Sequence, residues 1–457
     1  MPAADSPALI VARYLKANNY NETFEAFIQE VGLPYDSGNV SKGDLTLETL
    51  LEEKKTFDIS VQFEKLGVDD GTNNTGWTSP APSNAVEVAS LPTTSNILSA
   101  RIEHLVDGDE SAQPILLAST ADRRLHLLDG SGELQSSLVG MHDSPVLSCT
   151  ALGRSHLLTS SMSGQLHVSD LKGQVIEKRR DHLKYVVKVA VYQEGTDDTI
   201  VATAGWDGKI LIYRPTDITL GEPKATITLP TKPEAMLFVR HPDNGRPVLL
   251  VGRTDSSFIF YYSVEDEPRL LGKQNLAPHS NAWVAFTPSS MELCPTDPSL
   301  VAVGTSTVPS MKLLIVKLLF PPWTADTVIP AQLLRTSLLD DGPATETQAS
   351  QARAALATAD REAAVILIHC TTHAPQTAYS TPAVAWRPDG SGVWINGDDG
   401  AVRGIEASTG KVIATLQGHE AGSKVRCLCA GVVKDADGER EILVSGGFDQ
   451  KLILWKV

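Results

Sequence analysis

The last forty residues of the chain contain three connected stretches: Gly418-His419, then Ile442-Leu443-Val444-Ser445-Gly446-Gly447-Phe448-Asp449, then Lys451-Leu452-Ile453-Leu454-Trp455. The two apolar runs predict β-strands, and the glycines between them predict a tight turn. We expect Ser445 and Asp449 to bond His419, and His419 to reach the indole of Trp455. One buried polar chain would then join three strands.

The same strand, turn and strand pattern recurs about every forty to fifty residues beyond Asn96, which is the period of propeller repeats. The places of His419, Ser445, Asp449 and Trp455 are taken in an earlier unit by His182, Thr203, Asp207 and Tyr213. The pattern predicts an all-β β-propeller. Because the sequence ends two residues after Trp455, we expect a strand from about Ala85 to Leu91 to complete the last blade, so that the propeller spans residues 85–457.

The number of blades depends on residues 321–364. The Ala-rich stretch from Gln348 to Ala364 favours a helix. Yet Ala355 to Asp360, followed by Val365 to Ile368, also fits the blade pattern. If this stretch is a blade the ring has eight blades, and if it is an insertion the ring has seven. We prefer eight, because roughly 45 residues per blade is close to the usual period.

The first 35 residues predict two short amphipathic helices. Ser6-Pro7 is an N-cap followed by proline at the first helical position, and Asn18-Asn19 ends the first helix. Two such short helices cannot bury their apolar faces alone, so we expect this small α-helical domain to form a homodimer. The residues that we expect at the dimer interface are Ile10, Val11, Tyr14, Leu15, Tyr20, Phe24 and Phe27.

This hairpin resembles the LisH (Lis-homology) motif in the run Ile10-Val11-x-x-Tyr14-Leu15-x-x-x-Asn19-Tyr20-x-x-Thr23-Phe24-x-x-Phe27. Asn19 stands where the motif usually has glycine, and asparagine tolerates a left-handed backbone. With a propeller after it, the chain resembles the LisH-motif-containing WD-repeat proteins. The resemblance implies dimerisation through the hairpin and a role in protein–protein interaction, as in motor regulators, corepressor subunits, splicing factors and ubiquitin-ligase subunits.

The segment between the hairpin and the propeller divides into two parts. Residues 36–66 predict a short helical extension, and residues 67–84, with Asp-Asp-Gly and Ser-Pro-Ala-Pro-Ser, predict a flexible linker. Trp77 is the exception within the linker, and we expect it to lie against a neighbouring surface.

Bulk composition restricts the partners and the compartment. The 457 residues carry a net charge of −16, which argues against direct nucleic-acid binding. The five cysteines form no Cys-x-x-Cys pair, which indicates reduced thiols in the cytoplasm or nucleus. No apolar run approaches the roughly 20 residues that would span a membrane, and no signal peptide is evident.

No pattern in the sequence predicts catalysis or a cofactor. Ser, His and Asp recur together, but in a blade they face a packed aromatic ring and no oxyanion hole. His369 and His373 fall at the end of a predicted strand, where they lie roughly 13 Å apart, too far for one metal ion. We therefore expect no catalytic residue, no metal ligand and no cofactor.

The sequence thus predicts a non-enzymatic scaffold or adaptor subunit of a multiprotein complex, in the cytoplasm, the nucleus or both. Two alternatives stay open: a subunit of an RNA- or chromatin-associated complex, and a propeller enzyme. The enzyme would need a pocket in the central channel lined by convergent polar groups.

Overall fold

The computed structural model describes residues 6–40, 46–48, 76–106, 112–194, 198–216, 218–280, 284–323, 348–435 and 438–457. The chain divides into two compact units, Met1–Asn73 and Asn74–Val457. Each unit is described here by itself.

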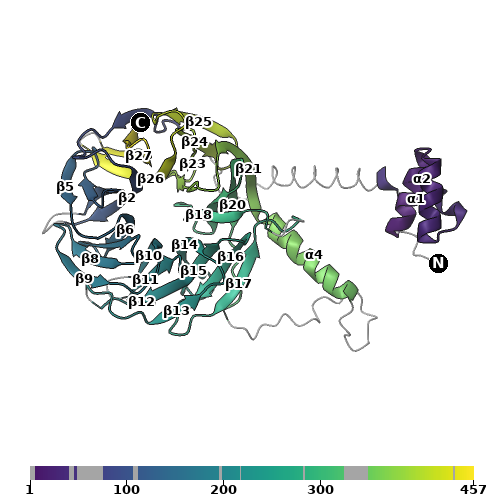
Figure 1. Cartoon of the computed structure of the whole chain (residues 1–457), viewed down its shortest axis with the longest axis horizontal. Helices are drawn as coiled ribbons and strands as arrows, with labels where there is room; N and C mark the ends of the chain where they lie inside the picture. The colour runs from purple at the N-terminus through teal and green to yellow at the C-terminus, as the bar shows by residue number, and fades with distance from the viewer. Residues whose placement is uncertain are drawn as a thin grey trace. The chain divides into compact units, whose positions relative to one another are not determined.

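The larger unit is a seven-bladed β-propeller: its described residues form seven four-stranded antiparallel sheets (Figure 1). The first blade contains β2 (Ile97–Leu105), β3 (Gln113–Thr120), β4 (Leu125–Leu128) and β5 (Leu134–Leu138). The second contains β6 (Val146–Leu152), β7 (His156–Ser161), β8 (Leu166–Asp170) and β9 (Val175–Arg179). The third contains β10 (Val186–Glu194), β11 (Asp198–Gly205), β12 (Lys209–Tyr213) and β13 (Ala225–Thr228).

The fourth to seventh blades follow in chain order, and only the last borrows a strand from upstream. The fourth blade contains β14 (Pro233–Arg240), β15 (Pro247–Arg253), β16 (Phe258–Ser263) and β17 (Leu270–Asn275), and the fifth contains β18 (Thr287–Leu293), β19 (Leu300–Ser306), β20 (Ser310–Lys317) and β21 (Ile366–Pro375). The sixth contains β22 (Val384–Trp386), β23 (Gly392–Asn396), β24 (Ala401–Glu406) and β25 (Val412–Gln417). The seventh contains β26 (Val425–Asp435), β27 (Gly438–Gly447), β28 (Leu452–Lys456) and the upstream strand β1 (Asn84–Glu87).

The first strand of each blade contacts the first strand of the next, and β26 contacts β2, so these seven strands line the centre of the ring. Each sheet is covered on both faces by neighbouring blades. The middle strands are therefore apolar on both faces: residues 115–120 of β3 and 210–213 of β12 are all buried. The core lies between the blades, as where Ile200 and Ala202 of the third pack with Leu249 and Val251 of the fourth.

The ring is closed by a strand from far upstream. β1 pairs antiparallel with β28 in the register Asn84↔Lys456 to Glu87↔Ile453. This confirms the expectation that an upstream strand completes the last blade. The closure couples two segments that are distant in sequence, so unfolding of the ring must break either this pairing or an interface between blades.

The preference for eight blades was wrong, because residues 348–364 form a helix. This helix is α4 (Gln348–Ala364). The run from Val365 to Ile368 leads into β21, which pairs with β20 as the outer strand of the fifth blade. Residues 321–364 therefore separate the third and fourth strands of one blade. Alanine favours helix over strand, and the described residues form seven sheets and no eighth.

The smaller unit is a helical hairpin. Its elements are α1 (Pro7–Ala17), α2 (Asn21–Val31) and a short 3₁₀ helix, η1 (Tyr35–Gly38). The backbone N–H of Leu9 donates to the Ser6 side chain, and Pro7 takes the first helical position. Asn19 has φ 59°, the left-handed conformation that the turn between the helices requires. Of the helical extension predicted for residues 36–66, the structure describes residues 36–40 and 46–48, and the rest lies outside the described residues.

Trp77 lies against the sixth blade, as expected. Its ring meets Trp394 edge-to-face, with 5.1 Å between centroids, and the Arg387 guanidinium lies 4.6 Å from its centre. Gly392 and Gly404 form the slot for the indole: a Cβ at either position would come within 2.4 Å of the ring. Residues 76–83, part of the predicted linker, are therefore held on the propeller just before β1.

Candidate functional site

The four residues predicted to join the strands of the last blade form one hydrogen-bonded chain in the structure. His419 Nδ1 lies 2.9 Å from Asp449 Oδ2, and His419 Nε2 lies 2.7 Å from Ser445 Oγ. The Trp455 indole N–H donates to Ser445 Oγ at 2.8 Å. We expected the indole to reach His419 directly, and the structure places the Ser445 hydroxyl between them. The chain thus runs from Trp455 through Ser445 and His419 to Asp449.

The third blade contains a similar chain. His182 Nδ1 lies 3.1 Å from Asp207 Oδ1, and His182 Nε2 lies 2.9 Å from Thr203 Oγ1. The Tyr213 hydroxyl interacts with the Thr203 side chain and donates to Asp181 at 3.0 Å, so the phenol also reaches a carboxylate in the preceding loop.

Both chains are buried, and this determines what they can do. His182, Thr203 and Ser445 have no exposed surface, and Trp455 is almost fully buried. Burial lowers the pKa of His419 and of His182, while the neighbouring carboxylates oppose the shift. A Ser–His–Asp set enclosed between strands has no access to a substrate. These residues stabilise the blades.

The second blade keeps only part of the chain. His142 Nε2 lies 2.8 Å from Thr159 Oγ1, but Ser163 occupies the position of Asp449 and bonds Asp143 instead. His142 and His167 are stacked with 3.8 Å between ring centroids. Burial lowers the pKa of His142 to about 3 and that of His167 to about 4. Both imidazoles are therefore neutral at physiological pH.

The hairpin divides the predicted dimer residues into two groups. Phe24 is 2% exposed and packs within the hairpin against Ala12 and Ile28, and Ile10 is also buried. Val11 and Tyr20 are 40% and 51% exposed. The other three predicted residues are half-buried: Tyr14, Leu15 and Phe27. Dimerisation itself stays a prediction, and within the described hairpin Val11 and Tyr20 are the members most accessible to a second copy.

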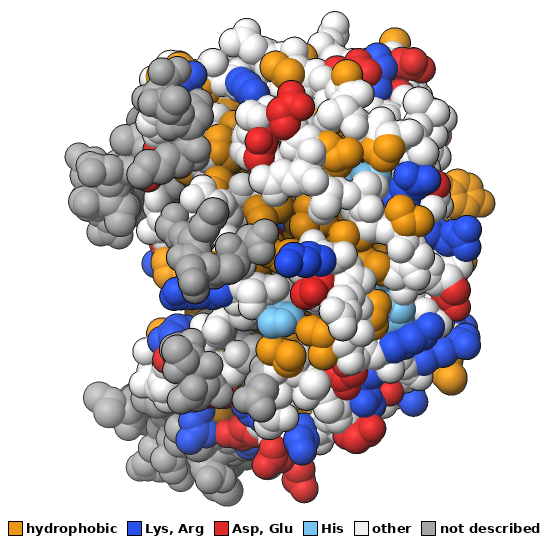
Figure 2. Space-filling view, turned by 90° about the vertical axis from the view of Figure 1, so that its left-hand side faces the viewer, with side chains coloured by type: hydrophobic (Ala, Val, Ile, Leu, Met, Phe, Trp, Pro, Cys, Tyr) orange, Lys and Arg blue, Asp and Glu red, His pale blue; other side chains and the backbone are white. Residues whose placement is uncertain are grey.

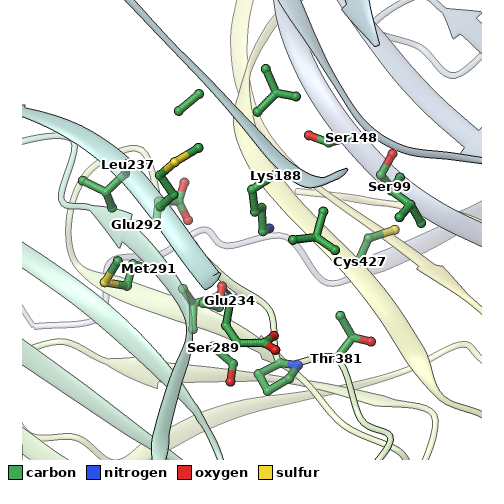
Figure 3. A pocket seen from close by; sticks show the side chains of 18 of the residues that line it. Ser99, Ser148, Lys188, Glu234, Leu237, Ser289, Met291, Glu292, Thr381 and Cys427 are labelled. Atoms are coloured by element: carbon green, nitrogen blue, oxygen red, sulfur yellow. Dashed lines mark hydrogen bonds between the residues drawn. The ribbon is translucent and has the colours of Figure 1, made fainter. Parts of the chain in front are cut away.

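A cavity of about 1030 Å³ occupies the centre of the propeller, and none of its residues was predicted from the sequence. It is lined by residues of the first strands of all seven blades. Figure 3 shows Lys188 projecting into it, between the side with Glu234 and Glu292 and the side with Ser99 and Cys427. Lys188 and Glu234 stand near the start of their first strands among apolar residues, and Glu292 stands near the end of β18 between Met291 and Leu293. That pattern could have marked them in the sequence.

The charged groups of the cavity differ in exposure: Lys188 is exposed, whereas Glu234 and Glu292 are half-buried. Burial raises the pKa of Glu234 to about 6 and that of Glu292 to about 7. Desolvation and the positive charges of Arg101 and Arg426 lower the pKa of Lys188, and the two carboxylates oppose this shift. Glu292 accepts a hydrogen bond from the backbone N–H of Trp386 at 3.0 Å. The cavity therefore contains the convergent polar groups that the enzyme alternative required.

The cavity thiols are poor nucleophiles. Burial raises the pKa of Cys149 and of Cys427 to about 12, so both are protonated at neutral pH. Among the residues that the structure describes, no group of three or more His, Cys, Asp or Glu side chains is placed to hold a metal ion. Within the same described ranges, no helix is long and apolar enough to cross a membrane.

The surface charges show no feature typical of nucleic-acid binding on the side seen in Figure 2. Lys and Arg side chains are interspersed there with Asp and Glu, and no continuous basic surface is visible among the described residues in that view. A basic stripe would be needed to offset the net charge of −16.

Two family models match the chain. The UCP007778 beta-propeller domain matches residues 71–456, and the LisH domain of the same family matches residues 8–36. No curated protein matches it. Because the propeller model covers most of the sequence, the chain belongs to the UCP007778 family, with an N-terminal LisH domain and a β-propeller domain.

Proposed function

We propose that this member of the UCP007778 family is a non-enzymatic scaffold or adaptor subunit of a multiprotein complex, acting in the cytoplasm or nucleus. It dimerises through the LisH hairpin and binds protein partners on a propeller of WD-type repeats. The observation that carries the proposal is the hairpin surface, where Val11 and Tyr20 are exposed although the hairpin has a very small core.

The hairpin needs a second copy for a physical reason. The buried cluster of its described core consists of three apolar residues, Ala12, Phe24 and Ile28. A buried side chain of the size of Phe or Ile contributes about 1.5–3 kcal/mol, which is little against the entropy of ordering two helices. Burial of Val11 and Tyr20 against the same residues of a second hairpin would add apolar area without new secondary structure.

The propeller supports binding better than catalysis. Its Ser–His–Asp sets are enclosed, and the thiols of its cavity are protonated at neutral pH. A rigid ring presents many loops at fixed positions, which suits simultaneous contacts with several proteins. Dimerisation would double these sites and raise avidity toward a repeated partner.

Light scattering of the purified full chain tests the proposal. We expect twice the chain mass for wild type, and the single-chain mass after deletion of residues 1–35 or for the double variant Val11→Glu/Tyr20→Glu. Gln29→Glu, on an exposed position of α2, is the matched control and should remain dimeric. A wild-type mass of one chain, or an unchanged dimer after the deletion, would refute dimerisation through the hairpin.

A further inference from the structure

The four most exposed large apolar side chains of the described chain all lie on one face of the propeller. They include Tyr379 and Leu183, which are 89% and 80% exposed. We call this the mouth face; it is formed by the loops from the outer strand of one blade to the first strand of the next, and by the turns between second and third strands. Its exposed large apolar residues are Val139, Leu183, Tyr185, Val308, Tyr379 and Phe448.

The opposite face is different. Of its described connections, only the one with Ile218 and the one with Leu356 of α4 expose a large apolar side chain. A concentration of exposed apolar side chains on one face indicates an interaction surface.

Cationic groups lie among these apolar residues. Tyr185 stacks on Trp206 with 5.2 Å between centroids, and Lys232 Nζ lies 4.7 Å from the centre of a Trp206 ring. On the last blade, the Arg426 guanidinium lies 5.6 Å from the Phe448 ring. Trp206, Lys232, Tyr379 and Arg426 also line the central cavity. The mouth face and the cavity are therefore one continuous surface.

Lys188 lies in the cavity, where the charges of Glu234 and Glu292 act on it from a distance. Among the described residues, no hydrogen bond or ion pair reaches its ammonium group, although the cavity wall surrounds it (Figure 3). It follows Leu183 and Tyr185 on the same segment, at the start of β10. Its side chain is exposed to the cavity, where an ammonium group without a direct ion-pair partner can bind an anion. The segment 183–188 thus leads from an apolar surface to an unpaired cation.

The acidic residues of the cavity do not cancel this preference. Four cationic side chains line the cavity against the two carboxylates of Glu234 and Glu292, so the lining keeps an excess of positive charge; the cations are Arg101, Lys188, Lys232 and Arg426. Glu292, whose pKa burial raises to about 7, is partly protonated at neutral pH, and in that form it can donate a hydrogen bond to an entering carboxylate. Arg101 and Arg426 add positive charge on the other sides of Lys188.

We propose that the mouth face and the central cavity bind an extended acidic peptide of a partner protein, with one carboxylate paired to Lys188 and an apolar side chain packed on Leu183 and Tyr185. A small anion would satisfy Lys188 but leave the apolar loops exposed, whereas a peptide occupies both and fits a cavity of about 1030 Å³. This inference rests on the proposed function, since it names the chemistry of the partner.

Selection from a random 12-residue peptide display library on the immobilised full-length protein tests the proposal. We expect enrichment of Asp and Glu next to Phe, Tyr, Trp or Leu. The most enriched peptide is then synthesised with a fluorescent label, and its affinity is measured by anisotropy. Enrichment of Lys and Arg, or no enrichment, would overturn the proposal.

Three variants locate the binding site. Lys188→Met should weaken the peptide about tenfold, and Lys188→Arg should restore most of the affinity because it keeps the charge. Leu183→Ser should weaken binding about fivefold. The matched control is Leu270→Ser, which removes an exposed leucine from outer strand β17 and should have no effect. An unchanged affinity for Lys188→Met would refute pairing at this residue.

The two proposals fail in different ways. If the protein is a dimer but Lys188→Met binds the selected peptide as wild type does, the scaffold stands and the peptide site is wrong. If the protein is a monomer and peptide binding depends on Lys188, the dimeric scaffold fails and the peptide site stands.

Discussion

The seventh and second blades contain the same backbone but satisfy their polar groups differently. In the seventh, every member of the chain from Trp455 to Asp449 has a partner. In the second, register places Ser169 at the position of Trp455 and His167 at that of Ile453. His142 Nδ1, both nitrogens of His167 and Ser169 Oγ are buried without a hydrogen-bond partner of ordinary geometry among the described residues.

This difference indicates which residues of the repeat a blade needs in order to fold. The second blade folds with the same four strands although its polar chain is incomplete, because its strands are buried between two neighbours. The seventh blade has an additional task, since it holds the closing strand β1. We therefore expect the polar chain to stabilise the seventh blade strongly and the second only slightly.

The largest contrast should come from the position of the acidic residue. Asp449→Ala leaves His419 Nδ1 and the backbone N–H of Glu420 without an acceptor, and we expect it to lower the free energy of unfolding by about 3 kcal/mol. Ser163→Ala, at the same position of the second blade, should cost less than about 1 kcal/mol. Thermal unfolding followed by calorimetry measures both. Equal losses would contradict the difference between the blades.

The second contrast is the pH dependence of stability. His142 and His167 have folded-state pKa values of about 3 and about 4, below the usual unfolded value of about 6.5. The unfolded chain therefore binds more protons between these values, and the free energy of unfolding falls as the pH falls from 6.5 toward 4.

His167→Leu should remove roughly 2 kcal/mol of this loss between pH 7 and pH 4.5. Denaturant unfolding at the two pH values, for wild type and variant, measures the effect. A pH dependence identical in both would show that His167 is not buried in its neutral form.

The smallest contrast concerns the hydroxyl groups. Ser169→Ala removes a hydroxyl that has no partner, so we expect a change within about 0.5 kcal/mol, in the stabilising direction. The corresponding loss for Ser445→Ala should be about 2 kcal/mol, because Ser445 bonds both His419 and Trp455. Melting temperatures of the two variants check this. A clear loss for Ser169→Ala would mean that the hydroxyl bonds a buried water.

The blades most easily predicted from sequence are those that keep the polar chain. His419, Ser445, Asp449 and Trp455 indicated a propeller because their types and spacing follow from local strand and turn geometry. The fifth blade was predicted incorrectly because its outer strand follows residues 321–364. Sequence alone cannot show that Val316 pairs with Ile366 across that insertion.

The channel residues escaped prediction for a different reason. Lys188, Glu234 and Glu292 belong to three blades, and only the closed ring brings their side chains to one cavity. A charged residue on a first strand is visible in the sequence, but its neighbours across the channel are not. The predicted hairpin residues have the same limit, because helical spacing does not separate the internal Phe24 from the exposed Val11 and Tyr20.

By itself the sequence determined the class of this protein: a propeller after a LisH hairpin, with a buried polar chain in its last blade. These features depend on short-range patterns that a strand or helix imposes on its own residues. The tertiary structure decided the number of blades, the register in which residues 84–87 close the ring, the blade on which Trp77 lies and the cavity around Lys188. Each of these depends on contacts between segments far apart in the chain, and such contacts form only when the ring closes.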